Sequence, residues 1–532
     1  MLQTMCKDSQ LFRKKVVFVA LICADSCYNC QRFIIFANRY IKYKTCYMTF
    51  EDIVSAVVNI IWSPFFVIVC LVAGLLFSIL TRFVQVRHFR EMVKLLFKDS
   101  REQKVGISSF QAFAMTLSGR VGTGNIAGVA TAIAFGGPGA IVWMWIIAFF
   151  GAGTAFVEST LAQIYKEKQG DEFRGGPAYY IKKGLKCKWL GAVFALCSVV
   201  GVGLFMPTVQ SNTIATAFYN AFGIEPIIIG IVVMVLLGLV IIGGVKRIAH
   251  VAQVVAPVMA VVYVVVALVV LVVNYERVPE TFALMLRSAF GLEAAFGAIV
   301  GNTIMWGVKR GVYSNEAGQG SGAIVAAAAK VSHPVKQGLV QSFSVYIDTL
   351  LVCTATAVMI LSTGMYNVID ENTGTMIVQN APHLTETSVS YTQAAVSTIM
   401  PNVGNAFIAF ALLFFAFTTL MAYYYYAETG LVYLFGKISK PGIWFLRVCL
   451  LVSTLYGSFN ESTLAWKFGD LGVGMMAWIN MFAILLLFPK AIRSLYSYER
   501  QKKEGKEPVF SPKDLNIKNA DYWEQNNETT KE

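Results

Sequence analysis

The sequence predicts an all-α membrane protein that crosses the bilayer many times. Of its 532 residues, 56% are apolar and only 14% are charged, and the mean hydropathy is +0.60. A soluble globule of this size would need more polar surface than that. The apolar residues gather into stretches that are long enough to span a membrane, which takes about twenty residues per helix. Two of these stretches are interrupted by glycine-rich runs, residues 118–128 and 314–322.

We predict eleven spans, each a largely apolar stretch of membrane length. Their approximate limits are 52–80, 107–136, 139–165, 189–219, 225–244, 250–273, 297–329, 338–362, 403–430, 441–459 and 470–489. The second and the seventh spans contain the glycine-rich runs. The tail after residue 489 is charged and increasingly polar, so we expect residues 513–532 to be disordered.

Lys and Arg are concentrated in alternate connections between the spans. The basic connections are residues 82–104, 166–188, 246–247, 330–336 and 437–440 and the C-terminal tail. The other connections hold only Arg277, Arg287 and Lys467. By the positive-inside rule the basic connections and the C-terminus lie in the cytoplasm, which predicts a multi-pass membrane protein with its C-terminus inside. Nucleic acid is not an expected partner, because the net charge of +13 forms no basic and aromatic groove.

Three segments outside the spans carry further predictions. Residues 82–104 mix aromatic and basic side chains, as in a helix on the cytoplasmic face of the membrane or in a solvated linker. The loop over residues 364–392 is a candidate cap at the outer end. Residues 1–47 hold five of the ten cysteines, whose spacing forms no metal or disulfide framework. This extension is either a marginal anchor or sequence upstream of a start at Met48.

The glycine-rich runs break membrane helices near their middle. Glycine inside a helix costs about 1 kcal/mol relative to alanine, and in lipid every freed backbone group needs another partner. Such breaks are tolerated where they are buried or line a watery cavity, and one break in each half of a chain indicates a transporter's binding site. The structural alternative is a tight helix crossing, which does not require the polar residues Thr123 and Asn125 at mid-membrane.

The two runs also define an internal repeat. The following pairs are each 196 residues apart: Gly122 and Gly318, Gly124 and Gly320, Ala127 and Ala323, Pro138 and Pro334. Five spans separate the two starts, so the second copy enters the membrane from the opposite side. We therefore predict inverted repeats over 107–273 and 297–489, preceded by an extra helix and an interfacial segment over 48–106 and followed by a cytoplasmic tail over 490–532.

A broken helix offers free N–H groups at one end and free carbonyls at the other, which suit a carboxylate and a cation respectively. The second run also supplies Asn315, Glu316 and Gln319. A carboxylate inside the membrane is expensive and is therefore a candidate for function. We expect Glu316 near a sodium ion, near a substrate ammonium or near Arg310. The structural alternative is a charge pair whose only role is to hold the break in its conformation. Arg310 is itself a candidate gate residue.

Other spans also contain polar side chains. Thr418 and Thr419 in the ninth span offer adjacent hydroxyls for an all-oxygen cation cage. Gln210 lies in the fourth span, Glu158 in the third and Asp348 in the eighth. Each is either part of an ordinary interhelical hydrogen bond or, for Glu158 and Asp348, a proton-relay or coupling group.

Four motifs resemble those of the alanine or glycine:cation symporter family. They are Gly119-Arg-Val-Gly-Thr-Gly-Asn-Ile-Ala-Gly128, Gly136-Gly-Pro-Gly-Ala140, Phe173-Arg-Gly-Gly-Pro-Ala-Tyr179 and Tyr313-Ser-Asn-Glu-Ala-Gly318. The resemblance runs from about Met48 to the C-terminal region. It implies a LeuT-type fold of two inverted five-helix repeats, and import of small neutral amino acids with sodium by alternating access.

The resemblance also implies a binding site. By similarity, main-chain N–H groups near Thr123 and Gly124 hold the substrate carboxylate. The implied sodium ligands are the carbonyls of Ser118 and Val121 and the hydroxyls of Thr418 and Thr419. The other implied substrate-binding residues are Asn125, Gln210, Asn315, Gly318, Gln319 and Gly320. Many family members have Met where this chain has Gln319, which leaves glycine, serine and glutamine open beside alanine.

The sequence thus predicts a secondary transporter that imports alanine or glycine with sodium. The alternatives are proton coupling, a glutamine or serine preference, or a channel. An enzyme is not predicted, because the four histidines lie in or beside connections and no nucleophile or metal motif occurs. Sodium is expected as the coupling ion, without another cofactor. The expected partners are the amino acid, sodium and the lipid bilayer.

Overall fold

The structure is a computed structural model that describes residues 50–98, 105–293, 296–371, 373–401, 403–436 and 440–529. The predicted N-terminal extension over residues 1–47 lies outside the described residues. The chain separates into two units, residues 1–56 and 57–532. Of the first unit the structure describes the start of helix α3 (Phe50–Ile61), where the Ser55 hydroxyl donates to the Glu51 carbonyl at 2.7 Å.

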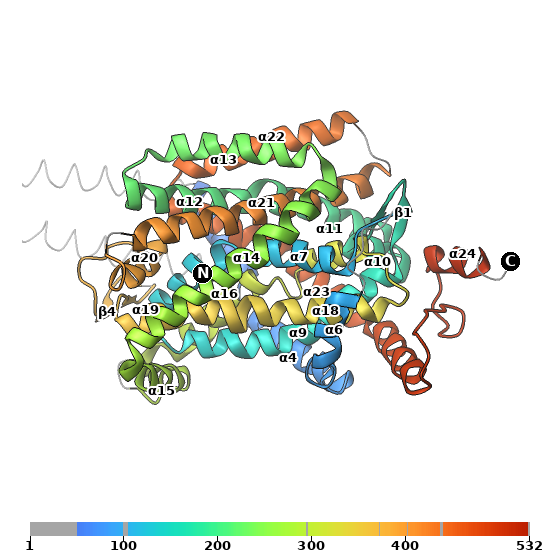
Figure 1. The fold of residues 1–532 in the computed structure, drawn as a ribbon, viewed down its shortest axis with the longest axis horizontal. Coiled ribbons are helices and arrows are strands. Elements are labelled where there is room, and N and C mark those ends of the chain that lie inside the picture. The colour runs from blue at the N-terminus through green and yellow to red at the C-terminus, as the bar shows by residue number, and fades with distance from the viewer. Residues whose placement is uncertain are drawn as a thin grey trace, which may run out of the picture. The chain divides into compact units, whose positions relative to one another are not determined.

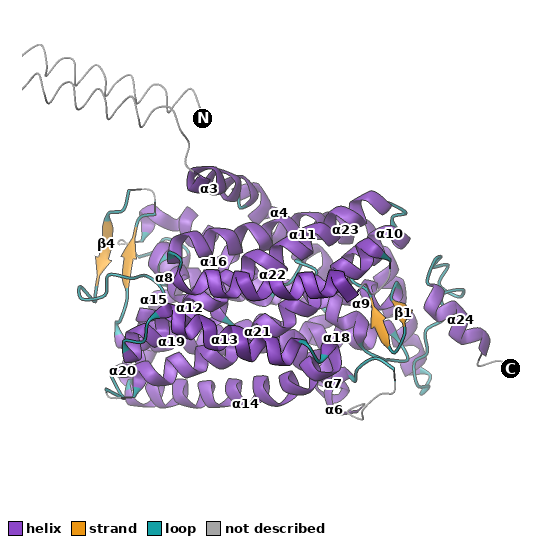
Figure 2. Ribbon diagram, turned by 90° about the horizontal axis from the view of Figure 1, so that it is seen from above, coloured by secondary structure: helices purple, strands orange, loops and turns teal. Residues whose placement is uncertain are grey.

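The second unit is built almost entirely from helices that run along one common direction (Figures 1 and 2). Its unbroken membrane helices are α4 (Pro64–Leu80), α9 (Ala140–Ile164), α11 (Lys188–Val200), α12 (Met206–Phe222), α13 (Pro226–Ile241), α14 (Gly244–Val273), α18 (Pro334–Val345), α19 (Thr354–Thr363), α21 (Gly404–Phe435), α22 (Lys440–Phe459) and α23 (Ser462–Lys503). The π-helical segments η2 (Gly201–Phe205) and η5 (Tyr346–Cys353) join α11 to α12 and α18 to α19.

Two further membrane helices are interrupted. Their parts are α7 (Ser109–Arg120), η1 (Gly124–Gly128) and α8 (Val129–Gly136) for the first, and α16 (Val300–Asn315) and α17 (Ser321–Ala328) for the second. The short helices are α5 (Val84–Arg87), α6 (Phe89–Lys98), α10 (Pro177–Gly184), η3 (Tyr275–Arg277), α15 (Val278–Ala289), η4 (Gly297–Ile299), α20 (Val389–Ser397) and α24 (Asp521–Thr529). The antiparallel hairpins are β1 (Glu167–Gln169) with β2 (Glu172–Arg174), and β3 (Asn367–Ile369) with β4 (Met376–Gln379).

The predicted spans match these helices closely at most positions. Among the described residues, eight helical stretches are long and apolar enough to cross a membrane. The exact count of eleven is not confirmed, because the broken helices and α13 are too short to be counted in this way. The last predicted span, 470–489, is wrong at both ends: α23 runs from Ser462 to Lys503 and continues through Pro489. Hydropathy marks only the apolar middle of such a helix, since its charged ends lie outside the hydrocarbon.

Burial separates the central helices from those that face lipid. In α9, 72% of the most apolar eighteen-residue window is buried, against 28% in α14. α9 packs against α4, α16, α17 and α18, and α21 packs against α7, α11, α12 and α14. The apolar residues that α13, α14 and α22 leave exposed are the surface expected toward lipid. The two glycine-rich breaks lie on helices of the interior.

The two ends of the helix array differ in composition. β1–β2, α10, α6 and α24 lie at one end, and β4, α15 and α20 lie at the other (Figures 1 and 2). We name the first the basic end, because the lysine-rich connections over 82–98, 166–188 and 330–336 converge on it. The helix predicted within 82–104 is confirmed for the described part as α5 and α6. At the other end, residues 364–392 form the β3–β4 hairpin and lead into α20.

The prediction that residues 513–532 are disordered is wrong for the described part of the tail. Residues 521–529 form α24, and Ile517, Ala520 and Trp523 are buried. The polar composition of the tail concealed these few buried apolar side chains, of which Trp523 donates from its indole to the Gln163 carbonyl outside the tail. A compositional average does not register isolated anchors of this kind.

Candidate functional site

The first break separates α7 from η1. α7 begins at the basic end with a capping box, in which Ser108 Oγ accepts from the Gln111 N–H at 3.1 Å and Gln111 Oε1 accepts from the Ser108 N–H at 3.0 Å. The helix ends at Arg120, where the backbone turns extended at Val121 (φ −78°, ψ 92°). The break therefore lies about one α7 length from the basic end, in the interior.

The N–H groups freed at this break meet side-chain amides. The Gly122 N–H donates to Asn125 Oδ1 at 2.9 Å, and the Thr123 N–H donates to Gln210 Oε1 at 3.1 Å. Gln210 lies on α12, so the fourth predicted span contributes directly to the break. Two convergent main-chain donors facing amide oxygens have the geometry that a substrate carboxylate needs, and a carboxylate is the stronger acceptor of the two.

The second break separates α16 from α17. The backbone is left-handed at Glu316 (φ +55°), Gly318 (φ +84°) and Gly320 (φ +89°). Glycine adopts this conformation without strain, but for Glu316 it costs about 1–3 kcal/mol, a kind of strain that clusters at functional sites. Asn315 Oδ1 accepts from the Ala317 N–H at 2.9 Å and fixes the turn. The sequence prediction of a break at this position is confirmed.

The two breaks lie against each other. A Cβ added to Gly124 would stand 3.2 Å from the Cα of Ser314, and one added to Gly322 would stand 2.9 Å from Nη2 of Arg120. Each half-helix end therefore packs closely on the other broken helix at these glycines. The predicted substrate residues Gly124, Asn125, Asn315 and Gly318 belong to one region of the interior.

The predicted sodium ligands are brought together in part. Thr419 Oγ1 on α21 lies 2.8 Å from the Ser118 carbonyl oxygen and 3.4 Å from that of Val121. A Cβ on Gly122 would stand 2.4 Å from Thr419 Oγ1, so only glycine lets α21 approach the break this closely. Thr419 Oγ1 also lies 3.0 Å from the Phe415 carbonyl oxygen of its own helix, to which the Thr418 hydroxyl donates at 2.9 Å. Ser118, Val121 and Thr419 thus bring together three oxygens, the ligand type that a hard cation prefers, and the sodium role of all four residues stays a prediction.

Asp348 joins the two broken helices from η5. Its carboxylate accepts from Asn125 Nδ2 at 2.6 Å, from Ser314 Oγ at 3.0 Å and from Thr349 Oγ1 at 2.6 Å. All of these side chains are buried. Its three donors come from both broken helices and from η5, so Asp348 ties the two breaks together at their junction.

Two more buried carboxylates surround the second break. Glu316 Oε2 accepts from Ser321 Oγ at 2.8 Å and from the Tyr426 hydroxyl at 3.4 Å. Glu158 Oε2 on α9 accepts from Asn480 Nδ2 at 2.9 Å, and the same amide also donates to the Gly318 carbonyl at 2.9 Å. Asn480 therefore links Glu158 to the main chain of the break.

The Arg120 guanidinium is the charge that faces these carboxylates. It acts electrostatically on Glu158, Glu316 and Asp348. It also donates to the Gln341 carbonyl at 3.0 Å and to the Ser344 hydroxyl. The three acidic side chains around the breaks thus share one buried guanidinium as their nearby positive charge.

Arg310 has a different partner from the one considered in the sequence. Arg310 Nη1 pairs with Asp470 Oδ1 at 2.9 Å, and Lys309 Nζ pairs with Asp470 Oδ2 at 2.7 Å. The rings of Trp306 and Trp466 lie 4.8 Å and 4.3 Å from the Arg310 guanidinium carbon. Arg310 is thus paired with Asp470, because α16 turns it toward α23, and the three alternatives for Glu316 stay predictions.

Several buried polar atoms around the breaks have no partner within the described part of the chain. They include Ser118 Oγ, Arg120 Nε and Nη2, Thr123 Oγ1, Glu158 Oε1, Tyr313 Oη, Asn315 Nδ2, Glu316 Oε1 and Gln319 Oε1. Buried polar groups are nearly always hydrogen-bonded. Their concentration at the two breaks fits a small ligand with both donors and acceptors, such as an amino acid.

Gln319 lies in the second break and faces α12. Its Nε2 contacts the Met206 sulfur at 3.8 Å, while its Oε1 is one of the unpartnered atoms. Gln319 and Gln210 thus bring two amides from different elements toward the same region.

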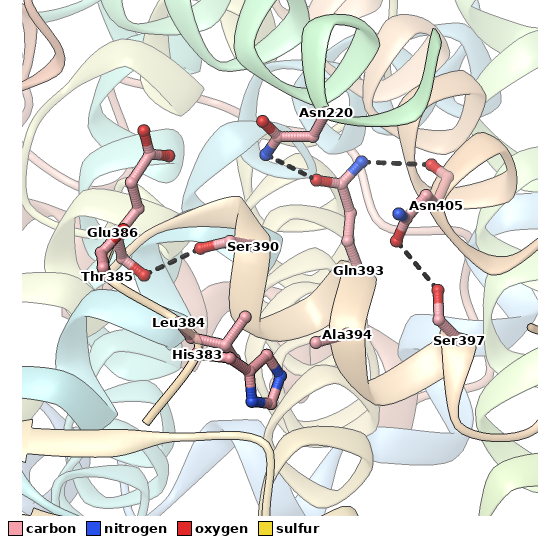
Figure 3. Close-up of a pocket in the computed structure, with 10 residues that line it drawn as sticks. All are labelled: Asn220, His383, Leu384, Thr385, Glu386, Ser390, Gln393, Ala394, Ser397 and Asn405. Carbon is pink, nitrogen blue, oxygen red and sulfur yellow. Dashed lines mark hydrogen bonds between the residues drawn. The ribbon is translucent and has the colours of Figure 1, made fainter. Parts of the chain in front are cut away.

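A separate cavity of about 460 Å³ opens at the end opposite the basic end, beside α20 (Figure 3). Its lining includes Asn220, Gln393 and Asn405. Asn220 Nδ2 donates to Gln393 Oε1 at 3.0 Å, and Gln393 Nε2 donates to the main-chain carbonyl of Asn405 at 3.2 Å. None of its lining residues belongs to either break.

Sequence reasoning missed Arg120, Tyr426, Asp470 and Asn480. Arg120 stands inside the first glycine-rich run, and a charge at mid-membrane is a functional signal by itself. Asp470 is likewise a charged residue at the start of a predicted membrane span. No local pattern marks Asn480 or Tyr426, which act only because α23 and α21 pass beside the second break.

Comparison with known proteins agrees with this picture. Residues 47–512 match the model of the sodium:alanine symporter family. Among curated relatives, the sodium/proton-dependent alanine carrier protein of Bacillus sp. (strain PS3) is 50% identical over 80% of this chain and 95% of its own. The probable sodium/glutamine symporter GlnT of Bacillus subtilis is 43% identical over 86% and 93%. The sodium/alanine symporter AgcS of Methanococcus maripaludis is 36% identical over 86% and 100%.

Solved structures support the fold. A manganese transporter from Eremococcus coleocola aligns with a TM-score of 0.50 at 13% identity, over 77% of this chain and 90% of that chain. The prediction of an all-α polytopic transporter fold is confirmed, and the family is one of symporters rather than enzymes. The chain therefore belongs to the sodium:alanine symporter family and is a multi-pass secondary transporter of the membrane.

Proposed function

We propose that this chain imports a small neutral amino acid, alanine or glycine, together with sodium. The observation that carries the proposal is the meeting of two broken helices, where the Gly122 and Thr123 N–H groups converge beside the Ser118 and Val121 carbonyls. A zwitterionic ligand and a cation are the pair that such ends attract. Two relatives carry alanine in their names.

Within this proposal, each ligand has a place. The substrate carboxylate replaces the amide oxygens of Asn125 and Gln210 at the freed N–H groups. Sodium lies among the oxygens of Ser118, Val121 and Thr419. The two ligands share the first break, so each can favour a different conformation through its differential affinity.

The alternating movement follows from the proposed repeats. We propose that residues 107–273 and 297–489 are inverted repeats, each starting with one broken helix. The basic end then faces the cytoplasm of a bacterial cell, with the C-terminus inside. The Arg310–Asp470 ion pair is the proposed gate toward the other side.

Proton coupling is the second candidate for the driving ion. Glu158, Glu316 and Asp348 are buried carboxylates around a single guanidinium, and a proton would supply the compensating charge as well as sodium does. The relative from strain PS3 is named as sodium/proton-dependent. The second candidate for the substrate is glutamine or serine, because Gln319 enlarges the polar wall of the site and one relative is named as a glutamine symporter.

Uptake into proteoliposomes tests the proposal. The purified full chain is reconstituted, and uptake of labelled alanine is measured under an inward sodium gradient, under an inward proton gradient, and without either. We expect sodium alone to drive accumulation. Accumulation driven by the proton gradient without sodium contradicts sodium coupling. It favours proton coupling through the buried carboxylates instead.

Substrate identity is tested in the same vesicles by competition. Unlabelled glycine, alanine, serine and glutamine are each added at equal concentration. We expect alanine and glycine to compete most strongly. Stronger competition by glutamine refutes the alanine assignment, and Gln319→Met is then expected to shift the preference back toward alanine.

A further inference from the structure

The C-terminal segment, residues 504–529, packs against the basic end instead of leaving it. Trp523 is 5% exposed and Phe510 is fully buried, although both belong to a polar tail. The two rings contact each other in an edge-on arrangement with centroids 5.2 Å apart. This aromatic pair forms the centre of the segment, and three separate parts of the chain are held around it.

The first contact is with the end of α9. The Trp523 indole donates to the Gln163 carbonyl at 2.9 Å. Lys166 is fully buried, and its Nζ lies over the rings of Tyr522 and Trp523 at 4.7 Å and 5.1 Å. A buried ammonium over aromatic faces gains a cation–π attraction, so the tail rings supply part of the surroundings that a charge at this position needs.

The second contact is with the linker between α17 and α18. The Phe510 N–H donates to the Ser332 carbonyl at 3.1 Å, and the Ser332 hydroxyl donates to the Pro508 carbonyl at 2.9 Å. Lys336 on α18 pairs with Glu507 at 2.5 Å. Backbone, hydroxyl and charge thus fasten residues 507–510 to the start of α18.

The third contact is with α10, which packs on α11. Asn519 Nδ2 donates to the Lys183 carbonyl at 2.9 Å, and Lys183 Nζ pairs with Asp521 at 2.8 Å. α11 lies on the α21 side of the molecule, whereas α18 packs on α9. The segment therefore links α10, which packs on both α9 and α11, to the end of α9 and to the start of α18.

The bridged elements surround the start of the first broken helix. The Gly106 N–H donates to the Asp171 carbonyl at 2.9 Å, the Ile107 N–H donates to the Ala328 carbonyl at 3.1 Å, and the Lys330 N–H donates to the Ile107 carbonyl at 3.0 Å. Lys166 Nζ also donates to the Ala329 carbonyl at 2.9 Å. The residues that anchor α7 are thus the neighbours of those that the tail binds.

α7 and α17 are the two half-helices that run from the breaks to the basic end, and they pack on each other. A route from the binding site to this end opens only if the start of α7 separates from residues 328–330 or from the β1–β2 turn. Conformational changes of this kind proceed by local release of packed elements. The tail spans the elements between which such a release takes place.

We propose that the C-terminal segment is a latch that holds the site closed at the basic end, through Trp523 on α9, Phe510 and Glu507 on the α17–α18 linker, and Asp521 on α10. The inference rests on the proposed alternating access, but it does not depend on which amino acid or ion is carried. Release of the latch precedes separation of α7 from residues 328–330. The tail thereby sets how often the site opens toward this end.

Amide hydrogen exchange of the full chain in lipid nanodiscs tests the latch without any substrate. In Trp523→Ala, we expect the amides of residues 105–110 and 328–333 to exchange about tenfold faster, as loss of the cation–π and indole contacts predicts. Amides of α20 at the opposite end should not change. The matched control is Trp189→Ala on α11, a tryptophan that is 69% exposed, which should leave residues 105–110 unchanged.

Faster exchange confined to the tail itself, with residues 105–110 unaffected, overturns the proposal. If Trp523→Ala loosens the whole protein, Asp521→Asn decides, because it removes one ion pair from a half-exposed carboxylate. A smaller acceleration at residues 105–110 supports the latch in that variant, and none refutes it. Failure of alanine uptake with an intact exchange response would reject the proposed substrate while leaving the latch standing.

Discussion

Removing the Thr419 hydroxyl tests the proposed sodium site directly. In Thr419→Ala the oxygen that lies 2.8 Å from the Ser118 carbonyl and 3.4 Å from the Val121 carbonyl disappears. A hydrogen bond or ligand contact to a charged group contributes about 1.5–3 kcal/mol, which corresponds to an increase of about ten- to a hundredfold in the sodium concentration for half-maximal uptake. The assay is uptake into proteoliposomes at a series of sodium concentrations and a fixed, saturating amino-acid concentration.

Two control variants sharpen this test. Thr419→Ser keeps the hydroxyl and should raise the sodium requirement only slightly. Thr454→Ala removes another buried threonine, whose hydroxyl donates to the Leu450 carbonyl of its own helix at 2.8 Å, and should leave it unchanged. An unchanged sodium requirement in Thr419→Ala, with normal expression and folding, refutes the placement of the cation at this break.

Two further predictions concern stability. Asp470→Asn leaves Lys309 and Arg310, which are 13% and 3% exposed, side by side without their carboxylate, so the free energy of unfolding should fall by about 3–5 kcal/mol; an unchanged melting temperature in detergent contradicts this. At the basic end, burial and nearby Lys336 lower the pKa of His333 from 6.5 to about 3, and its Nδ1 accepts from the Val335 N–H at 3.3 Å. Because the unfolded chain binds the proton more tightly, this group costs no stability above about pH 6.5 and destabilises the fold increasingly as the pH falls toward 3. Thermal unfolding at pH 7 and pH 4.5 should show a smaller acid loss in His333→Asn than in the original chain, and equal losses refute the reasoning.

The spans and the breaks could be predicted from the sequence because each depends on the residue types of one short stretch of the chain. A membrane span needs about twenty apolar residues in a row, and Gly318 and Gly320 mark positions where the backbone is left-handed. Glu316 shares that conformation without being glycine, which no residue-type rule anticipates. Its strain is visible only once α16 and α17 have been placed on either side of it.

The contacts across the site could not be predicted in the same way. Arg310 pairs with Asp470 because α23 passes beside α16. Asn480, also on α23, donates to the main chain of the second break. These pairings join residues more than 150 positions apart. Hydropathy and residue spacing predict where each membrane helix lies in the sequence. They say little about which helix faces pack against each other.

The π-helical segment η5 constrains how many residues the chain can have between two interhelical contacts. Before it, the Ser342 hydroxyl donates to the Ala152 carbonyl at 2.8 Å; after it, Thr356 bonds the Tyr263 hydroxyl at 2.7 Å. One residue turns an α-helix by about 100°, so deleting a single residue between positions 346 and 353 would rotate one of these contacts away from its partner. Asp348 would turn with it. The π-helical segment therefore constrains the number of residues here more strictly than their identity. Related chains should differ in the residue types of this segment more often than in its length.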